Sequence, residues 1–399
     1  MTTHKGTGLV TAFLLFTLLS CGKKEDSVES YIGFDIPKST VDQYLEEQMK
    51  ARKIPGMSIA LFEDGKIVHH KTFGYANWQD SVKVNDQTIF EAASLSKPMF
   101  AYFVMKYVDE GKLDLDKPLY EYLPYPDIAY DERYKQITAR MVLSHRSGFP
   151  NWRNDLPDNK LVIQFDPGTD FFYSGEGYMY LSKVLKHIDQ TDWEGLERSF
   201  QAKVAQPLGL EHTVFIQDDY SIRHKAEPYD ENGQWVSPER DYDSLFRYQF
   251  RAPASVHTEA IDFSKWLIAL CNREGLSEAS YQEMWKVHSF VDEYNGIPID
   301  YTLGFYKPDL PFTNIYSHGG NNYGFTAYFT FDPDKKWGFA LFTNSEYGEE
   351  LGGEFSFFML TGPDLTKLYI IAGAILLTVL VLLFLGLRFL IRRLKKRRG

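Results

Sequence analysis

Strand-like runs of apolar residues cluster near the two ends of this 399-residue chain and are rare between them. Residues 112–250 instead read as helices and loops rich in proline and tyrosine. A sheet made of the terminal runs must join distant segments and carry a helical insertion. We therefore expect an α+β fold, with an antiparallel sheet flanked by helices and an inserted all-helical subdomain. The predicted strands are 57–62, 67–73, 301–306, 323–331 and 337–343.

Two local patterns add detail to this expectation. Asp64-Gly65 lies between the first two strands and favours a tight hairpin turn. Cys271 falls in a predicted helix, so we expect a buried free thiol and no disulfide. Amphipathic or apolar periodicity predicts helices at 39–53, 94–110, 178–188, 261–272 and 349–360.

Residues 1–21 read as a secretory signal, in which Lys5 precedes an apolar run that ends at Leu18-Leu19-Ser20-Cys21. This ending resembles a bacterial lipobox, whose cysteine becomes the lipidated first residue of the mature protein. We therefore expect lipidation at Cys21, followed by a polar tether over 22–38. The alternative is an uncleaved signal anchor, although the apolar core is short for a membrane span.

A second apolar stretch, 368–387, contains no charged residue. At about 1.5 Å per residue it is long enough to cross a hydrocarbon core of about 30 Å. The basic tail 388–399 follows at once, and positive charge beside a span marks the cytoplasmic side. We expect a transmembrane helix at 368–387, with the preceding chain outside the cytoplasmic (inner) membrane of a bacterium. A buried core helix is the alternative, and it leaves the basic tail unexplained.

The charge of the chain argues against a nucleic-acid partner. The net charge is −11 at pH 7, and the body before residue 388 is more acidic still, because the tail is basic. An acidic surface repels a phosphate backbone. We therefore expect no nucleic-acid binding.

Ser94 and Lys97 form an S-x-x-K pattern at the start of the helix predicted to run to Glu110. Positions three apart share a helix face, so the hydroxyl and the amine should be neighbours. A neutral, desolvated lysine can take the proton of a serine hydroxyl and activate it as a nucleophile. The pattern alone is weak, and it recurs without functional meaning at Ser20–Lys23.

Two later stretches also combine reactive side chains with glycine. Tyr173 precedes a glycine-rich turn at the start of a predicted helix, and His318-Gly319-Gly320-Asn321 places glycines where a backbone must approach something closely. Taken singly, each is more often structural than functional. Their order along the chain, after Ser94 and Lys97, gives them weight.

In this order the three stretches resemble the serine beta-lactamase and penicillin-binding-protein superfamily, in its class C-like branch. The resemblance covers most of a domain that we place at 39–362, and it includes 137–148, 207–210 and 325–332. Its motif matches are Ser94-Leu95-Ser96-Lys97 to Ser-x-x-Lys, Tyr173-Ser174-Gly175 to the first position of Tyr-x-Asn, and His318-Gly319-Gly320 to a His-x-Gly variant of Lys-Thr-Gly.

The resemblance implies a serine hydrolase that forms an acyl-enzyme with a peptide, amide or ester, of the D-amino-acid peptidase or esterase type. Ser94 would attack the carbonyl, and Lys97 and Tyr173 would share the general-base work. The backbone N–H groups of Ser94 and Asn321 would form the oxyanion hole. No metal or organic cofactor is implied.

Four residues are implied to border the substrate: His318, Gly319, Gly320 and Gly175. His318 would line the cleft and touch the substrate or the Tyr173 hydroxyl. Gly175 replaces an Asn that the family uses to bond the lysine amine and the substrate amide, and His318 replaces a lysine that helps to hold a carboxylate. We therefore expect short acyl esters to be turned over at least about tenfold faster, by kcat/KM, than penicillins or cephalosporins.

Two other functions stay open at this point. The domain could be a catalytically weak or inactive module that binds penicillin or peptidoglycan peptides, or a true class C-like beta-lactamase. An α/β-hydrolase is excluded, because the chain contains no G-x-S-x-G elbow.

Overall fold

The computed structural model describes residues 26–237, 243–311, 313–363 and 365–396. The chain divides into two compact units, one of residues 42–357 and one that joins the residues up to 41 with those from 358 onward. The predicted signal over 1–21 and the predicted lipidation site Cys21 lie outside the described residues. The remaining candidate site residues belong to the larger unit.

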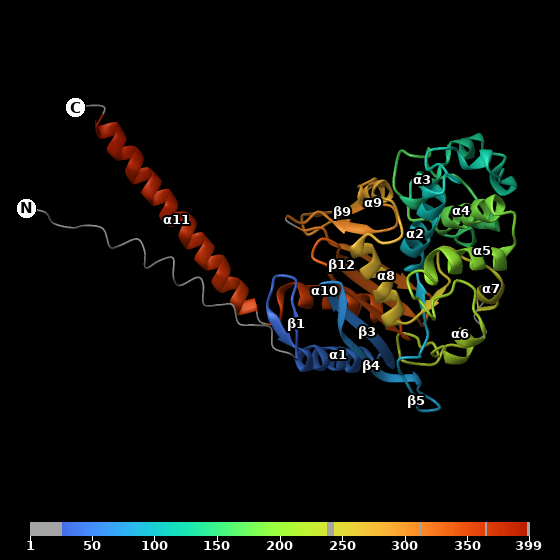
Figure 1. Cartoon of the computed structure of the whole chain (residues 1–399), viewed down its shortest axis with the longest axis horizontal. Helices are drawn as coiled ribbons and strands as arrows, with labels where there is room; N and C mark the ends of the chain where they lie inside the picture. Colours follow the sequence, from blue (N-terminus) through green and yellow to red (C-terminus); the bar gives the residue numbers. More distant parts are fainter. Residues whose placement is uncertain (1–25, 238–242, 312, 364, 397–399) are drawn as a thin grey trace, which may run out of the picture. The chain divides into compact units, whose positions relative to one another are not determined.

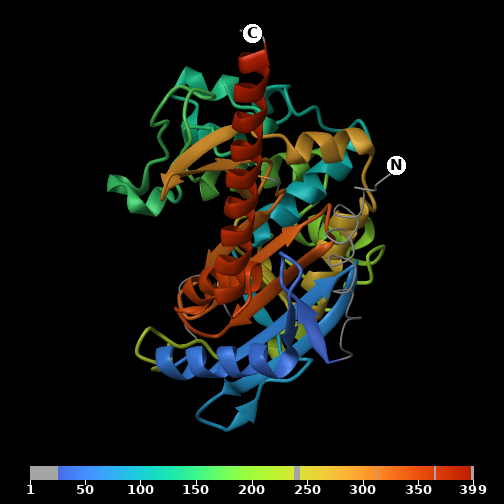
Figure 2. The same ribbon diagram turned by 90° about the vertical axis from the view of Figure 1, so that its left-hand side faces the viewer.

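Within the described residues, the larger unit is built on a nine-stranded antiparallel sheet with the order β5-β4-β3-β13-β12-β11-β10-β9-β8 (Figure 1). The two strand-rich ends of the chain meet in this sheet, where β3 pairs with β13 and Ala60 lies opposite Ala340. Figure 2 shows these blue and orange-red strands side by side. The α+β fold with an antiparallel sheet is thus confirmed. The strands are β3 Gly56–Glu63, β4 Lys66–Asn77, β5 Val82–Lys83, β8 Ser289–Tyr294, β9 Ile297–Tyr301, β10 Tyr306–Pro308, β11 Tyr316–Asn321, β12 Thr326–Asp332 and β13 Trp337–Thr343.

The predicted hairpin between β3 and β4 is confirmed. Asp64 and Gly65 both have a positive φ, of 49° and 73°, which is the backbone conformation that a two-residue type I′ turn requires. Every residue of β3 is buried, in keeping with its continuous apolar run. The turn chemistry therefore defines the hairpin, and the burial of β3 agrees with its place between β4 and β13 inside the sheet.

Helices are the main regular elements of the chain between β5 and β8, with loops between them, as expected for the insertion. Helix α8 packs against β3, β4 and β13, and Figure 1 shows α3 to α7 grouped beside α2. The insertion is not all-helical, however, because β6 (Phe90–Ala93) pairs with β7 (Val256–Thr258). Both strands are short and fully buried, so no alternation of polar and apolar residues reveals them. The helices are α2 Ser96–Asp109, α3 Ala139–Leu143, α4 Gly175–Ile188, α5 Trp193–Phe200, α6 Asp219–His224, α7 Asp243–Tyr248, α8 Ala260–Asn272 and α9 Glu278–Trp285.

Helix α2 is the core of the helical part. Most of its side chains are buried, as expected for a helix that is apolar on all sides. The Phe100 ring lies 5.9 Å from the Tyr178 ring and 6.1 Å from that of Phe250, and the Phe103 ring lies 5.6 Å from that of Phe200. These contacts join α2 to α4, α5 and the segment before β7, and so fix the position of its first turn.

The strand predicted at 301–306 is wrong. Tyr301 ends β9 and Tyr306 begins β10, and the two strands pair with each other. Gly304, between them, has φ +96°, a conformation that breaks a strand and suits glycine. A Cβ at this position would lie 3.0 Å from Pro98 and Ala101, so the turn fits closely against the start of α2.

The smaller unit contains a β-hairpin of β1 (Ser27–Glu29) and β2 (Asp35–Pro37). The hairpin lies in the segment predicted as a tether, and Val28 and Ile36 are fully buried. The Tyr31 N–H donates to the Met359 carbonyl oxygen at 2.8 Å. Helices α1 (Lys38–Arg52) and α10 (Gly348–Thr361) continue from this unit into the larger one, and α11 spans Leu365–Lys396.

Among the described residues, no helix combines the length and the apolarity needed to cross a membrane. The transmembrane helix predicted at 368–387 is therefore not supported. Cys271 is buried on α8 as a free thiol.

Candidate active site

Ser94 lies in the turn between β6 and α2, two residues before the helix begins. Ala93 has a left-handed φ of 50°, which reverses the chain sharply ahead of the serine. The Lys97 N–H donates to the Ser94 carbonyl oxygen at 3.0 Å. The predicted helix therefore starts later than expected, but the turn still places Ser94 and Lys97 on one face.

Lys97 lies within hydrogen-bonding distance of the Ser94 hydroxyl. Its Nζ is 3.0 Å from Ser94 Oγ and donates to the Pro253 carbonyl oxygen at 2.9 Å. The side chain is only 1% exposed, and no carboxylate of the described residues forms an ion pair with it. Burial holds the pKa of the Lys97 amine well below its usual value. The amine is therefore suited to accept the Ser94 proton.

The Tyr173 ring lies next to the Lys97 amine. Lys97 Nζ is 4.4 Å from the centroid of the Tyr173 ring. Burial raises the pKa of the Tyr173 hydroxyl, and hydrogen bonding to Ser94 opposes the rise. The phenol therefore keeps its proton at neutral pH and can donate it, while Lys97 is the stronger candidate for the base.

The segment after Tyr173 is fixed by local hydrogen bonds. Ser174 caps α4 by accepting the Gly177 N–H at 3.0 Å, and its own N–H donates to His145 Nδ1 at 3.0 Å. His145 is fully buried with a left-handed φ of 57°. Its ring lies 4.3 Å from the Tyr173 ring, centroid to centroid. His145, which the sequence did not single out, thus helps to position Tyr173.

Gly175 has a steric reason to be glycine. A Cβ there would lie 2.9 Å from the Trp152 indole and 3.0 Å from the Asn151 carbonyl oxygen. The indole of Trp152 therefore occupies the space into which a longer side chain at this position would extend. No sequence signal linked Trp152 to Gly175, because the two lie on separate segments of the helical part.

His318 lies behind the site. It is 1% exposed on β11 and does not line the pocket described below. Its Nδ1 lies 2.6 Å from the Gly319 carbonyl oxygen and its Nε2 lies 3.2 Å from the Tyr301 hydroxyl, so Nδ1 donates and Nε2 accepts. Burial, and then the nearby Lys97, lower the pKa of His318 to about 3. The ring is neutral, and its centroid lies 6.1 Å from that of Tyr173.

The two glycines of β11 allow close approach on both faces of the strand. A Cβ on Gly320 would lie 2.7 Å from the Ala92 carbonyl oxygen and 2.8 Å from the Ser94 backbone nitrogen. A Cβ on Gly319 would overlap the Glu349 carboxylate. The glycine at 320 therefore brings the end of β11 against the backbone of the nucleophile.

Asn321 follows directly and lines the pocket. Its side chain donates to the Glu346 carboxylate at 2.8 Å and accepts the Tyr323 N–H at 2.7 Å. The amide side chain is thus engaged by neighbouring residues. The predicted role of Asn321, an oxyanion contact through its backbone N–H, concerns the main chain and stays a prediction.

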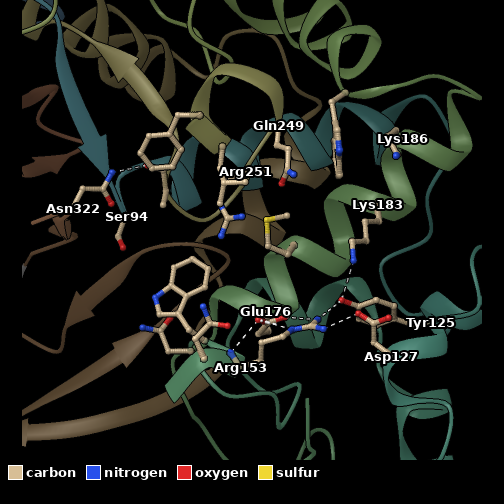
Figure 3. Close-up of a pocket in the computed structure, with 18 of the residues that line it drawn as sticks. Ser94, Tyr125, Asp127, Arg153, Glu176, Lys183, Lys186, Gln249, Arg251 and Asn322 are labelled. Carbon is tan, nitrogen blue, oxygen red and sulfur yellow. Dashed lines mark hydrogen bonds and ion pairs between the residues drawn. The ribbon is translucent and has the colours of Figure 1, made fainter. Parts of the chain in front are cut away.

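Ser94 opens into a pocket of about 1260 Å³ (Figure 3). The figure shows the Arg251 guanidinium directed into this space, with Glu176 and Arg153 on the facing side. The sequence did not reveal these residues or Trp152 as part of the site, because no motif connects them to Ser94. Within the described residues, no cluster of His, Cys, Asp and Glu suited to a metal ion is found.

Known proteins share these features of sequence and fold. The family model for Beta-lactamase matches residues 41–354. Protein flp of Staphylococcus aureus (strain MW2) is 25% identical over 329 residues, which cover 78% of this chain and 64% of that protein. The chain thus spans less than two thirds of the length of this relative.

Two solved structures show the same fold. The octameric penicillin-binding protein homologue from Pyrococcus abyssi superposes with a TM-score of 0.70 at 24% identity, over 82% of this chain and 78% of that one. EstCE1, a hydrolase with promiscuous acyltransferase activity, gives a TM-score of 0.66 at 21% identity, over 78% of this chain and 94% of that one. Since the family match covers most of the chain, and includes the Ser94, Tyr173 and His318 elements, the protein belongs to the Beta-lactamase family.

Proposed function

We propose that this protein is a serine hydrolase that cleaves a peptide, amide or ester through an acyl-enzyme on Ser94. The observation that carries the proposal is the 3.0 Å separation of Lys97 Nζ and Ser94 Oγ, with the amine buried and lacking an acidic partner among the described residues. A serine needs a base of this kind to become nucleophilic at neutral pH.

The reaction follows from these positions. Ser94 Oγ forms a bond to the substrate carbonyl carbon while its proton passes to Lys97 Nζ. The carbonyl oxygen becomes an oxyanion beside the Ser94 N–H, at the end of β11. When the bond to the leaving group breaks, the leaving group takes a proton from Lys97 or through the Tyr173 hydroxyl. Water then attacks the acyl carbon while its proton passes to the freed Lys97 amine, and this proton returns to Ser94 Oγ as its bond to the acyl group breaks.

The experiment is covalent labelling of the full-length protein with a fluorophosphonate probe and a fluorescent penicillin, with the adduct located by peptide mass. We expect the fluorophosphonate on Ser94, and none on a Ser94→Ala variant that keeps its circular dichroism spectrum. Ser199→Ala is a matched control, since Ser199 lies on α5 and does not line the pocket.

Two further variants test the base. Lys97→Ala and Tyr173→Phe should each lower the rate of labelling by roughly 10²-fold or more, the scale of lost general-base catalysis. Labelling of Ser94 without turnover of any ester, amide or β-lactam would indicate a binding module instead. Equal labelling of the Ser94→Ala variant would exclude Ser94 as the nucleophile.

We also propose that the protein acts outside the cytoplasm at a bacterial membrane. This proposal rests on the signal-like sequence at 1–21, on the basic tail 388–399, and on the exposed apolar side chains of α11 between Leu376 and Ile391. Exposed apolar surface of this extent needs a nonpolar partner, and lipid is one. Fractionation should find the full chain with membranes, and should find a chain ending at Gly362 released from them once Cys21→Ala also removes the predicted lipid anchor.

A further inference from the structure

The pocket beyond Ser94 is lined by side chains of both charges. It contains the carboxylates of Asp127, Asp155 and Glu176 and the cations Arg153, Lys183, Lys186 and Arg251. This mixture contrasts with the net charge of −11 of the whole chain. The two arginines among these cations, Arg153 and Arg251, differ in their partners.

Arg153 is fully engaged by the protein. Its guanidinium donates to Glu176 at 3.0 and 2.8 Å, to Asp127 at 2.7 Å and to the Tyr125 hydroxyl at 2.8 Å. Such a two-pronged contact with a carboxylate is the strong arrangement for arginine. The charge of Arg153 is therefore paired with the carboxylates of Glu176 and Asp127, and these three side chains line the pocket without offering a free charge to a ligand.

Arg251 differs, because its guanidinium forms no hydrogen bond or ion pair with the residues that the structure describes. Its nearest aromatic contact is the Trp152 ring, whose centroid lies 5.6 Å from the guanidinium carbon. The side chain is partly buried, and burial lowers the pKa of its guanidinium, an effect that Glu176 opposes. A desolvated arginine without a partner is costly unless something else pairs with it.

The position of Arg251 relates it to the nucleophile. It lies in the segment between α7 and β7, two residues before Pro253, whose carbonyl oxygen accepts from the Lys97 amine. Ser94 and Arg251 line the same pocket, and Figure 3 shows the guanidinium pointing into the space beyond Ser94. A substrate bound at Ser94 can therefore reach Arg251 with its remaining part.

We propose that Arg251 determines specificity by binding a negatively charged group, such as a carboxylate, on the substrate that Ser94 attacks. This inference rests on the proposed function. The guanidinium offers a planar fork of N–H donors that matches a carboxylate. His318 cannot serve this purpose, since it is neutral and does not line the pocket.

The test compares matched chromogenic esters that differ only in charge. One pair is a nitrophenyl monoester of a short dicarboxylic acid and the ester of the neutral acid of equal length. In a second pair the carboxylate is on the alcohol. kcat/KM is measured on the full-length protein and on Arg251→Gln, Arg251→Lys and Arg198→Gln. Arg198 is an exposed cation on α5 outside the pocket, so its variant removes the same charge elsewhere.

We expect Arg251→Gln to lower the anionic-to-neutral ratio of kcat/KM by about tenfold or more in at least one pair, the range of a charge-assisted hydrogen bond. Arg251→Lys should retain part of this ratio and Arg198→Gln nearly all of it. An unchanged ratio in both pairs for Arg251→Gln would overturn the inference. Failure of the proposed function looks different, because the wild-type protein would then hydrolyse none of the four esters and Ser94 would not be labelled.

Discussion

The substitution Gly320→Ala tests whether the contact between β11 and the nucleophile turn sets the activity. The new Cβ would lie 2.7 Å from the Ala92 carbonyl oxygen and 2.8 Å from the Ser94 nitrogen. Ordinary van der Waals contact begins near 3.4 Å, so the two backbones must separate by roughly 0.6 Å or more. Both neighbours are main-chain atoms, which cannot turn aside as a side chain can.

A shift of this size acts directly on the reacting atoms. The Ser94 nitrogen and the end of β11 border the predicted oxyanion position, and loss of one oxyanion donor lowers kcat by about 10²–10³-fold. A misplacement of about 1 Å costs about 10²-fold. We therefore expect kcat/KM for a chromogenic ester to fall about 10²-fold. The free energy of unfolding should fall by about 1–3 kcal/mol, the usual cost of overpacking.

The matched control is Gly353→Ala on α10, where a Cβ would meet nothing within 4 Å. This variant should keep the wild-type rate and gain up to about 1 kcal/mol of stability, because alanine is the better helix former. Ester kinetics, the rate of fluorophosphonate labelling and urea unfolding are measured on all three proteins. A Gly320→Ala protein that is folded and as active as wild type would refute the reasoning.

Three further predictions concern charge, packing and substrate. Because the pKa of Lys97 is lower in the folded than in the unfolded protein, the wild type loses stability as the pH falls below the usual lysine value of 10.5. Lys97→Met lacks this titrating group, so urea unfolding should show its stability rising relative to that of the wild type as the pH is lowered from about 10.5 to about 7. Gly175→Asn should lower the free energy of unfolding by about 1–3 kcal/mol through its clash with Trp152, and thermal melts should show most of this loss recovered when Trp152→Ala is added. A chromogenic short acyl ester should be hydrolysed at least about tenfold faster, by kcat/KM, than a chromogenic cephalosporin, because neutral His318 stands where the family places a lysine that helps to hold the β-lactam carboxylate; a cephalosporin that wins would mean that another group, such as Arg251, supplies that charge.

The parts of the fold that the sequence predicted depend on local chemistry. The Asp64-Gly65 turn needs two residues with positive φ, and the Asp-Gly dipeptide by itself favours that conformation. The Ser94–Lys97 spacing makes the two residues neighbours in the turn that leads into α2, whatever surrounds them. These predictions need no knowledge of the distant chain.

The parts that the sequence did not predict depend on contacts between separate segments. Nothing near Gly175 reveals that Trp152 fills the space beside it, and nothing near Arg251 reveals that it faces the pocket of Ser94. The interior direction of His318 likewise depends on its pairing with Tyr301 across the sheet. In each case the side chain is defined by a partner that tertiary packing supplies.

The environment of Lys97 supports the proposed acyl transfer although two of the family's polar elements are replaced. Burial alone lowers the pKa of the Lys97 amine. This effect does not require the asparagine or the lysine that the family places where this chain has Gly175 and His318. The two nearby histidines, His145 and His318, are held neutral by burial and by the proximity of the lysine, so neither adds a competing positive charge. A carboxylate in their place would stabilise the protonated amine and remove the base. In the proposed mechanism the replaced elements bear on which substrate binds, whereas proton transfer from Ser94 depends on a buried lysine without an acidic partner among the described residues.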